Sequence, residues 1–428
     1  MNTNSVNMPE TIYSASWIVS PHTEPIEGGA ILVRNGFIAA TGKLEELRRT
    51  HGSTPVVDFP DCVLMPGLVN AHTHLELTYF PAWRLRTHID YNPRRFVDWI
   101  IQLIKIKRGL ALEDYQASIR EGLRMCLEAG TTVTGEIAGN SSLAGLYHNS
   151  LLSGRLFFEV LGHDPVTFQP LLKRAIEACI TDNAANFASG ISPHSPYTIG
   201  EGNLSLIREE AFSRGFPLAI HISESAAESD FMFSSSGPLA EELYPFAGWE
   251  RYLTPPRRMS STDFLDRAGL LSSATLAIHC VHINLADAEI LKKRGVHVAL
   301  CPRSNNYLDV GRAPVALLKK LGIPLALGTD SLASNDSLSM WDEMRFALES
   351  FPKDLSALDV FRMATSNGAA ALGLKASHGS LEPGKRADFQ VIGKIGTAAD
   401  KLLERAILSG EVLDVFSAGR RYAGIVTC

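Results

Sequence analysis

Two histidines stand one residue apart after an apolar run, in the stretch MPGLVNAHTHLELTYF that covers residues 65–80. Residues 63–70 are predicted to form a short strand. If it continues through His74, His72 and His74 face the same side, because side chains alternate along a strand. Two imidazoles on one side are half of a metal site. An isolated HxH pair is more often two half-buried histidines bonded to the backbone, so other parts of the chain must decide.

Residues of similar chemistry follow later apolar runs. PLAIHIS is followed by a glutamate, TLAIH ends in a histidine, and IPLALGTD ends in an aspartate; these residues are His221, Glu224, His279 and Asp330. Three imidazoles and a carboxylate, on strands that meet around one axis, can bind a divalent transition metal and leave a position for water. Each residue alone could be structural, but the set indicates a metal site.

The elements that must position this set alternate between strand-like and helix-like segments. Helical patterns separate most strands and end at glycine, as at Gly130 and Gly295. Eight such units in about 300 residues predict an α/β fold, a (β/α)8 TIM barrel with its chemistry at the C-terminal strand ends. After the strand that begins at residue 63, the predicted strands are 131–137, 155–162, 187–194, 217–223, 275–282, 297–302 and 323–330.

Both ends of the chain consist of short strands and turns, including an Asn35-Gly36 hairpin signal and a turn near Gly419. Neither end is long enough for a stable all-β domain, so the two are predicted to pair into one small β-sandwich domain. The expected domains are residues 1–64 and 375–428, which share the β-domain, and 65–374, the barrel. The Ser, Gly and Pro-rich segment 226–262 follows the fifth strand and is either a lid on the catalytic rim or a surface excursion.

Composition excludes several classes of protein. Hydrophobic residues make up 45% of the 428 residues and charged residues 20%, and the net charge of −6 includes no basic block that would indicate nucleic acid binding. No apolar stretch approaches the roughly 18 residues of a membrane span, and the N-terminus lacks signal-peptide features. None of the six cysteines forms a CxxC pair, which predicts reduced thiols in a cytoplasmic protein. Cys280, beside His279, is either a nucleophile or a buried structural thiol.

The motifs PGLVNAHTHLEL, SPHSPYT, HISES, AIHC, CPRSN, GTDSLASN and EPGKRADFQVI occur in an order that resembles the amidohydrolase superfamily. The resemblance implies that His72, His74, His221 and Asp330 hold one divalent metal, zinc or iron. Binuclear relatives carry a carboxylated lysine on the fourth strand. The single lysine between residues 131 and 221 is Lys173, in a helical pattern, so the chain looks like the mononuclear branch of deaminases and chlorohydrolases.

The resemblance also implies roles for residues around the metal. The metal lowers the pKa of a water from about 15.7 towards 7. Asp330 takes the water's proton, Glu224 protonates a ring nitrogen and the leaving amine, and His279 orients the hydroxide. His282 is expected to be structural. The expected substrate-binding residues are His194, Glu76, Asn305 and Ser334.

The motifs HTHLEL, FVDWIIQLIKIKR and PHSPY look most like bacterial 6-amino-6-deoxyfutalosine deaminases of menaquinone biosynthesis. This substrate joins adenosine to a benzoate, so a cation near the rim is expected. The alternatives are deamination of S-adenosylhomocysteine, methylthioadenosine or guanine, a chlorohydrolase, or a non-catalytic binder. The partner is expected to be a small molecule, and a homodimer is possible. Most of the arginines after the first strand are expected to be a solvated face; they are Arg84, Arg86, Arg94, Arg95 and Arg108.

Overall fold

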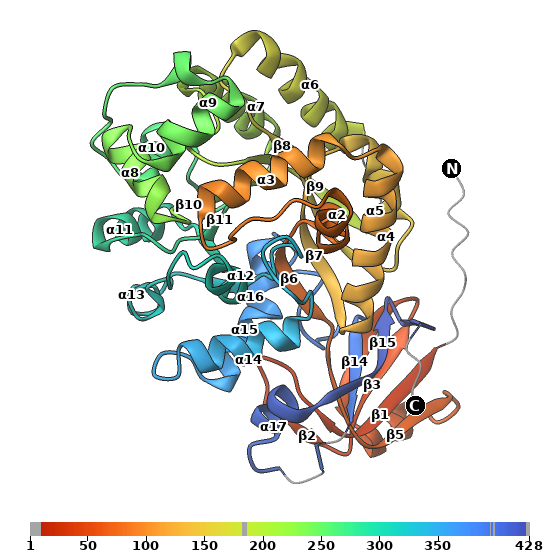
Figure 1. Ribbon diagram of the computed structural model, residues 1–428. Helices are drawn as coiled ribbons and strands as arrows, with labels where there is room; N and C mark the ends of the chain where they lie inside the picture. The colour runs from red at the N-terminus through yellow and green to blue at the C-terminus, as the bar shows by residue number, and fades with distance from the viewer. Residues whose placement is uncertain (1–9, 182–185, 394, 397–398, 425–428) are drawn as a thin grey trace.

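The computed structural model describes residues 10–181, 186–393, 395–396 and 399–424. Eight parallel strands form a barrel in the order β13-β12-β11-β10-β9-β8-β7-β6, and a bridge between Thr73 and Asp330 brings the last strand back to the first (Figure 1). The (β/α)8 fold is confirmed, and the seven predicted strands from residue 131 onwards each coincide with a barrel strand. The bounds of the eight barrel strands are β6 Leu68–Thr73, β7 Thr131–Ala138, β8 Ser153–Val160, β9 Phe187–Pro193, β10 Leu218–Ile222, β11 Thr275–His279, β12 His297–Leu300 and β13 Leu325–Leu327.

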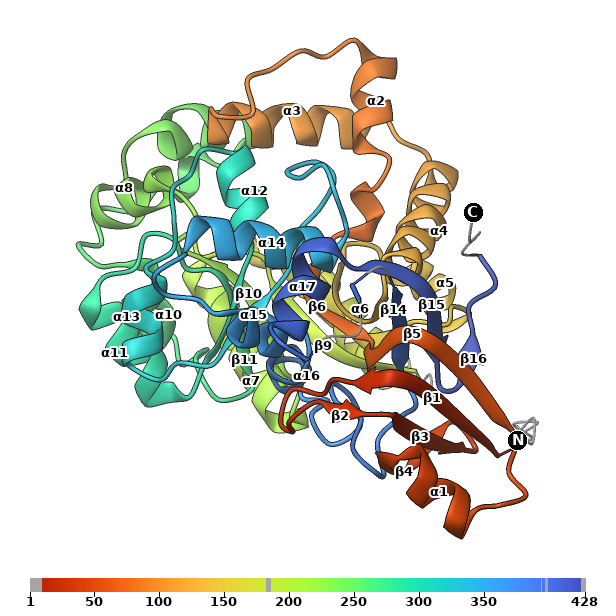
Figure 2. The same cartoon turned by 90° about the horizontal axis from the view of Figure 1, so that it is seen from below.

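Helices follow the barrel strands and cover the outside of the barrel (Figure 2). Gly295 ends one of them in the left-handed conformation, with φ of 69°, as the sequence predicts. These helices are α4 Leu112–Glu128, α5 Ala144–His148, α6 Pro165–Thr181, α7 Glu201–Arg214, α8 Ala226–Ser234, α10 Ser261–Arg267, α11 Leu285–Arg294, α12 Pro302–Tyr307, α13 Val315–Lys320, α14 Met340–Ser350, α15 Ala357–Met363 and α16 Ser366–Ala371. Among the described residues, no helix has both the length and the apolar character needed to cross a bilayer.

Two helices after β6, α2 Phe80–Thr87 and α3 Phe96–Arg108, stand apart from this ring. They form an arm at the edge of the barrel, seen at the top of Figure 2. The arm meets the 226–262 segment, because α3 contacts the short helix η3 Leu239–Leu243. That segment also contains α9 Tyr244–Ala247 and η4 Glu250–Tyr252. Two insertions therefore meet beside the C-terminal ends of the strands.

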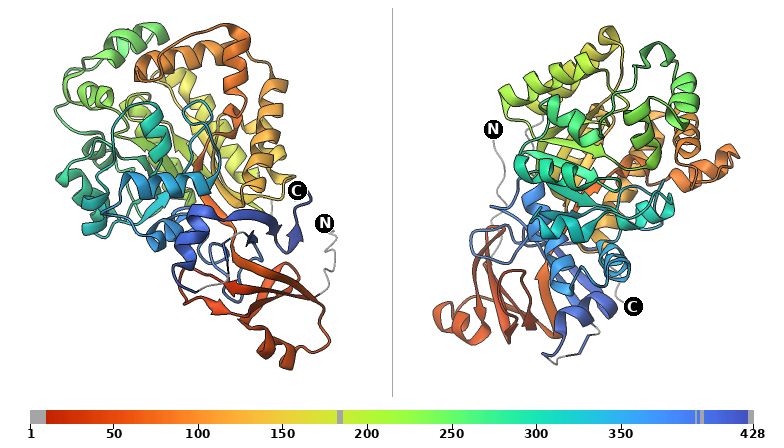
Figure 3. Two further views of the ribbon diagram at one scale, coloured as in Figure 1. Left: turned by 60° about the horizontal axis from the view of Figure 1, so that its bottom comes forward. Right: turned by 90° about the vertical axis from the view of Figure 1, so that its left-hand side faces the viewer.

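Strands from both chain ends form a second sheet, as predicted (Figure 3). The two ends meet where β14 pairs antiparallel with β5, from Phe389 opposite Pro66 to Ile392 opposite Val63. Hydrogen bonds join all its strands into one mixed sheet, packed around the stacked rings of Phe389 and Phe416. Its elements are β1 Thr11–Ile18, β2 Ile26–Glu27, β3 Gly29–Arg34, β4 Phe37–Lys43, β5 Val56–Pro66, β14 Phe389–Gly393, β15 Glu411–Ser417, β16 Arg420–Arg421, and helices α1 Leu44–Thr50 and α17 Leu402–Ser409.

The prediction of one strand over residues 63–70 is wrong. The chain leaves the small sheet at Pro66 and enters the barrel at Leu68. Gly67 makes this transition beside Thr132, where a Cβ atom would lie 2.2 Å from the threonine Oγ1, so a side chain cannot be accommodated without a shift. The sequence does not indicate that the strand is interrupted at Gly67, because the residues on both sides of it are apolar and buried. His72 lies within β6, and His74 lies one residue beyond its end.

Candidate metal centre and active site

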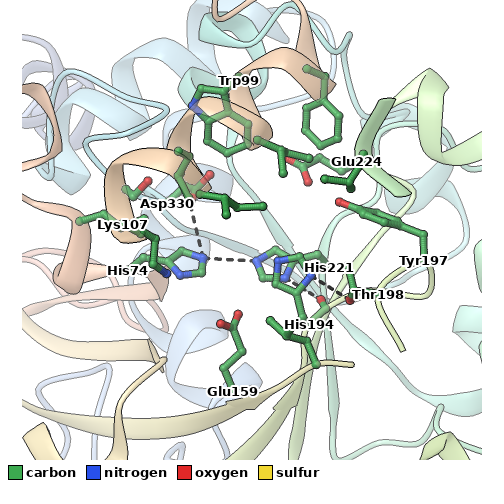
Figure 4. A pocket seen from close by; sticks show the side chains of 18 of the residues that line it. His74, Trp99, Lys107, Glu159, His194, Tyr197, Thr198, His221, Glu224 and Asp330 are labelled. Carbon is green, nitrogen blue, oxygen red and sulfur yellow. Dashed lines mark hydrogen bonds and ion pairs between the residues drawn. The ribbon is translucent and has the colours of Figure 1, made fainter. Parts of the chain in front are cut away.

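Three strand ends, those of β6, β10 and β13, bring the predicted ligands together; His74, His221 and Asp330 are labelled in Figure 4. The Nε2 atoms of His74 and His221 lie 3.3 Å apart. Asp330 Oδ1 lies 3.6 Å from His72 Nε2 and 3.7 Å from His74 Nε2. The four donor atoms therefore surround a common centre, and the HxH pair does converge on one side although its second member lies beyond the strand.

The donor set fits a divalent transition metal. Two nitrogens bound at 2.0–2.1 Å by a tetrahedral ion lie about 3.3 Å apart, the separation found between His74 and His221. Neither ring nitrogen of His72 has a hydrogen-bond partner among the described residues, although this side chain is fully buried. A buried imidazole without a partner is costly, and a cation at the centre would satisfy it. Lys173 lies on the surface of α6 beside Glu177, so it cannot bridge a second metal here.

Burial sets the protonation of the ligands. It lowers the pKa of His74 and of His221 well below the ordinary value, and the nearby imidazole of His72 acts in the same direction. Burial alone would raise the pKa of Asp330, but the His72 imidazole, with Nε2 3.6 Å from Oδ1, and the imidazoles of His74 and His279 hold it well below its usual range. Neutral imidazoles and an ionised carboxylate are the forms that bind a metal ion.

Hydrogen bonds to the atoms that face away from the centre orient Asp330 and His221. Asp330 Oδ2 accepts from Ser304 Oγ at 2.7 Å and from Ser334 Oγ at 2.8 Å, so Oδ1 faces the imidazoles. His221 Nδ1 bonds the carbonyl oxygen of His194 at 2.7 Å, which turns Nε2 towards the centre. These contacts leave one nitrogen or oxygen of each ligand free for a cation.

Two candidate acid–base groups lie beside the ligands. Glu224 Oε1 lies 3.5 Å from His279 Nε2, and both side chains line the cavity. His279 is oriented by Asn305, whose Oδ1 lies 3.0 Å from His279 Nδ1. Burial raises the pKa of Glu224 well above its usual range, and the charge of Asp330 raises it further. Burial lowers the pKa of His279 to about 4.

The turn after β10 holds Glu224 in place. Ser223 has φ of 53°, which a residue with a side chain adopts only when its surroundings impose it. The carboxylate of Glu228 does so: Oε1 accepts from the Ser223 N–H at 2.7 Å, and Oε2 accepts from the Glu224 N–H at 2.9 Å. Ser261 Oγ donates to the same carboxylate. Glu228 is fully buried and is a positioning residue for Glu224.

Glu228→Gln is expected to lower kcat about 10–100-fold and to leave KM and metal content nearly unchanged, because the glutamine amide would face one of the two backbone N–H groups. Steady-state kinetics and elemental analysis test this. Glu241→Gln, an exposed change on the same segment, is the control. An unchanged kcat would mean that the turn keeps its conformation without this carboxylate.

A cavity of about 360 Å³ lies beside the centre. The apolar face of α3 forms one wall with Phe96, Trp99, Ile100 and Leu103, and Leu243 and Trp249 of the 226–262 segment form another part. This segment therefore lines the site, and a surface excursion without a role is contradicted. The cavity's polar residues at the strand ends include Glu159, His194 and Thr198, and Lys107 lies at the end of α3 (Figure 4).

The expected substrate-binding residues are divided by the structure. His194 lines the cavity, whereas Asn305 and Ser334 lie behind the ligands and do not line it. Glu76 is only 5% exposed, and its carboxylate accepts the Asn140 N–H at 3.0 Å in the loop after β7. It too is outside the cavity lining within the described part of the chain. Three of the four candidates thus support the site from outside.

Other expectations for neighbouring residues can now be resolved. Burial raises the pKa of the Cys280 thiol, and this side chain is fully buried, so the structural role applies rather than the nucleophilic one. His282 bonds the carbonyl oxygen of Val310 at 2.6 Å, as expected for a structural residue. Among the predicted arginines, Arg84 and Arg86 pair with Asp90 and Asp114, at 2.7 and 2.9 Å. Of the five, Arg108 lines the cavity.

The cavity residues that sequence reasoning missed include Trp99, Lys107, Glu159 and Trp249. The sequence could have identified Trp99 and Lys107, because they follow the i, i+3, i+4 spacing of one face of the helix FVDWIIQLIKIKR. The sequence evidence for Glu159 is weaker: it is a carboxylate near the end of the predicted third strand. Trp249 had none, because no sequence pattern indicates which part of a long insertion turns towards the site.

Imidazoles and carboxylates that could hold a metal ion, gathered at the C-terminal strand ends of a barrel, are an arrangement typical of metal-dependent hydrolases. The chain belongs to the amidohydrolase family, whose model matches residues 63–421. It is 31% identical to a 5-methylthioadenosine/S-adenosylhomocysteine deaminase of Syntrophobacter fumaroxidans, over 87% of this chain and 82% of the relative. It is 28% identical to an aminodeoxyfutalosine deaminase of Deinococcus radiodurans, over 81% of each.

Solved structures show the same fold. An adenosine deaminase from Xanthomonas campestris with bound zinc aligns with a TM-score of 0.80 and 26% identity, over 96% of this chain and 92% of that one. The aminofutalosine deaminase of Helicobacter pylori in complex with methylthio-coformycin aligns with a TM-score of 0.84 and 23% identity, over 96% of this chain and the whole of that one. The second likeness concerns the fold alone.

Proposed function

We propose that this protein is a metal-dependent hydrolytic deaminase that releases ammonia from an adenosine-type nucleoside. The observation that carries the proposal is the pair Glu224 and His279, which lies within the cavity next to the ligand cluster. A protein that only binds a ligand has no need for such a proton-carrying pair. The deaminase names of the relatives agree with this function. A cytoplasmic location, predicted from unpaired cysteines, belongs to the same proposal.

The proposed mechanism assigns one role to each residue. His72, His74, His221 and Asp330 would hold the ion, which when bound makes a water acidic enough to react near neutral pH. Asp330 would accept a proton from the attacking water. Glu224 would donate a proton to the ring nitrogen next to the amino carbon as the water oxygen bonds to that carbon, and would then carry the hydroxyl proton of the adduct to the amine. The C–N bond breaks, ammonia leaves, and the proton held by Asp330 returns to Glu224. His279, held by Asn305 through Nδ1, would orient the attacking oxygen with Nε2.

We propose 6-amino-6-deoxyfutalosine, an intermediate of menaquinone biosynthesis, as the substrate. The apolar wall of α3 can contact an aryl ring, and Lys107 and Arg108 follow on the same helix, where they can face a carboxylate. Arg108 lies over the ring of Phe246 at 4.9 Å and is exposed. Methylthioadenosine and S-adenosylhomocysteine are the alternatives, because relatives carry those names.

In a panel with adenosine, methylthioadenosine, S-adenosylhomocysteine and guanine, 6-amino-6-deoxyfutalosine is expected to have the highest kcat/KM. An ammonia-coupled assay measures it. Because Arg108 is exposed, Arg108→Ala should lower this preference by only about 1 kcal/mol, or about fivefold. Arg86→Ala, outside the cavity, is the matched control and should change nothing. If another nucleoside or guanine is preferred, deamination stands and this substrate does not. If no compound releases ammonia, a chlorohydrolase is the next activity to test.

A further inference from the structure

His74 depends on its own backbone for its orientation more than the other ligands do. Its polar contacts, to His221 and Asp330, both involve Nε2, and no hydrogen bond to its Nδ1 is found among the described residues. His72 is instead fully buried within β6, where its carbonyl oxygen accepts the Asp330 N–H at 3.1 Å. His74 lies one residue beyond that strand, and its side chain is 18% exposed. Whatever fixes the chain around residue 74 therefore also fixes this ligand.

Glu136, on β7, contacts the chain on both sides of His74. Its Oε2 lies 2.5 Å from Thr73 Oγ1, and its Oε1 accepts the Leu75 N–H at 2.9 Å. Thr73 ends β6, and Leu75 begins the short helix η1 Leu75–Leu77, whose N-cap residue His74 supplies no side-chain cap. The Glu136 carboxyl takes the place of that cap, because it satisfies an N–H group at the start of the helix. It thus bridges the two residues that flank the ligand.

Glu136 is itself held in place and lies away from the reacting groups. Its side chain is fully buried, and Oε1 also accepts the hydroxyl of Tyr147, on α5, at 2.8 Å. Within the described part of the chain it neither lines the cavity nor belongs to the groups that could hold a metal ion. Burial raises the pKa of Glu136 to about 8, so the carboxyl is mostly uncharged near pH 7 and acts through its hydrogen bonds. Any effect on the site must pass through the neighbouring backbone.

We infer that Glu136 is a positioning residue for His74: it fixes the chain on both sides of this ligand and so determines where Nε2 meets the other donor atoms. The Nε2 atom lies 3.3 Å from that of His221 and 3.7 Å from Asp330 Oδ1, and a shift of the backbone would change both separations. Groups that orient a ligand typically contribute about 10–100-fold to metal affinity. The inference rests on the metal centre of the proposed function and is independent of the substrate.

The first test measures the zinc dissociation constant of the wild type, Glu136→Met and Glu136→Gln by competition with a chromophoric chelator. Methionine keeps the length of the side chain but bonds neither neighbour, so the dissociation constant should rise about 10–100-fold. Glutamine can still accept the Leu75 N–H and donate to the Thr73 hydroxyl, so it should stay within about threefold of the wild type. The visible absorption of the cobalt(II)-loaded protein, which reports the geometry of the ligands, should change in Glu136→Met and not in Glu136→Gln.

A second test leaves Glu136 unchanged. Thr73→Val removes the hydroxyl that meets Oε2 and should weaken zinc binding about tenfold, whereas Thr73→Ser keeps the hydroxyl and should restore the affinity. Thr134→Val is the matched control. Thr134 is also a buried threonine and lies on β7, but its hydroxyl has no hydrogen-bond partner among the described residues. Its zinc affinity should equal that of the wild type.

The outcomes separate a positioning role from a structural one. Wild-type zinc affinity in Glu136→Met and Thr73→Val, with only the melting temperature of the metal-free protein lowered, would overturn the inference and make Glu136 a structural residue. Equal losses of affinity in Thr73→Val and Thr134→Val would also overturn it. If Glu136→Met does not fold, the two threonine variants decide by the same criteria. A wild type that binds neither zinc nor cobalt would overturn the inference together with the metal centre, whereas a wild type that binds metal but releases no ammonia would contradict the proposed deaminase alone.

Discussion

Glu224→Gln is expected to lower kcat about 10²–10⁴-fold and to leave the metal bound, because glutamine keeps the shape of the side chain but cannot carry a proton. Glu224 follows the ligand His221 by three residues and lies in the cavity, next to His279 rather than among the closest ligand atoms. The change therefore removes proton transfer without removing a ligand. The ammonia-coupled assay gives kcat, and elemental analysis of the same sample gives the metal content.

Two variants make this result specific. Asp330→Asn should lose both activity and metal affinity, since Asp330 faces two imidazoles through Oδ1. Glu209→Gln, an exposed substitution on α7, should behave as the wild type. A Glu224→Gln enzyme within tenfold of the wild type would remove Glu224 from the mechanism. Loss of metal from Glu224→Gln would instead make it a ligand.

The barrel could be predicted because its strands are apolar runs of the right length, most of them separated by helical patterns, two of which end at a glycine, Gly130 and Gly295. The ligands could be predicted for a related reason: all parallel strands of a barrel end on the same face, so polar residues at these ends must converge. The same convergence holds for His74, a residue just beyond a strand end. It lies outside the regular strand, yet its Nε2 still lies 3.3 Å from that of His221.

The distinction between lining and supporting residues could not be predicted from motifs. Asn305 and Ser334 belong to the segments CPRSN and GTDSLASN, which indicate that the residues are near the site but not which way they point. Asn305 is directed by His279, which ends another strand, and Ser334 is directed by Asp330, four residues earlier in its own loop. Only the folded chain brings these partners together.

The helix α3 shows what the apolar periodicity of one helix cannot predict. The apolar stripe from Phe96 to Ile104 is the one an amphipathic helix buries against a protein core. Here part of it faces the cavity, where Trp99 and Ile100 remain partly exposed. Periodicity identifies an apolar face but does not say whether protein or ligand covers it. The composition of the cavity therefore had to come from the structure.

Removal of the metal by exhaustive chelation is expected to lower activity by more than about 10³-fold, because without the ion no residue of the site can make a water acidic enough to attack. Since four protein donors surround one centre and Lys173 is on the surface, about one equivalent of zinc or iron per chain should restore full activity. The apoprotein should also unfold at a lower temperature, because a ligand that binds the native state alone stabilises it.

A pair of histidine variants separates a ligand from a structural residue. His221→Ala removes one of the two Nε2 atoms that lie 3.3 Å apart, so it should lose the bound metal and the increase in melting temperature on metal addition. His282→Ala removes a side chain that bonds the carbonyl oxygen of Val310, so it should keep both, although its melting temperature without metal should fall. Elemental analysis and thermal unfolding record these effects independently of activity. Two tightly bound metals per fully active chain, or full activity after chelation, would contradict a single catalytic metal, and retention of metal by His221→Ala would place the ion away from these strand ends.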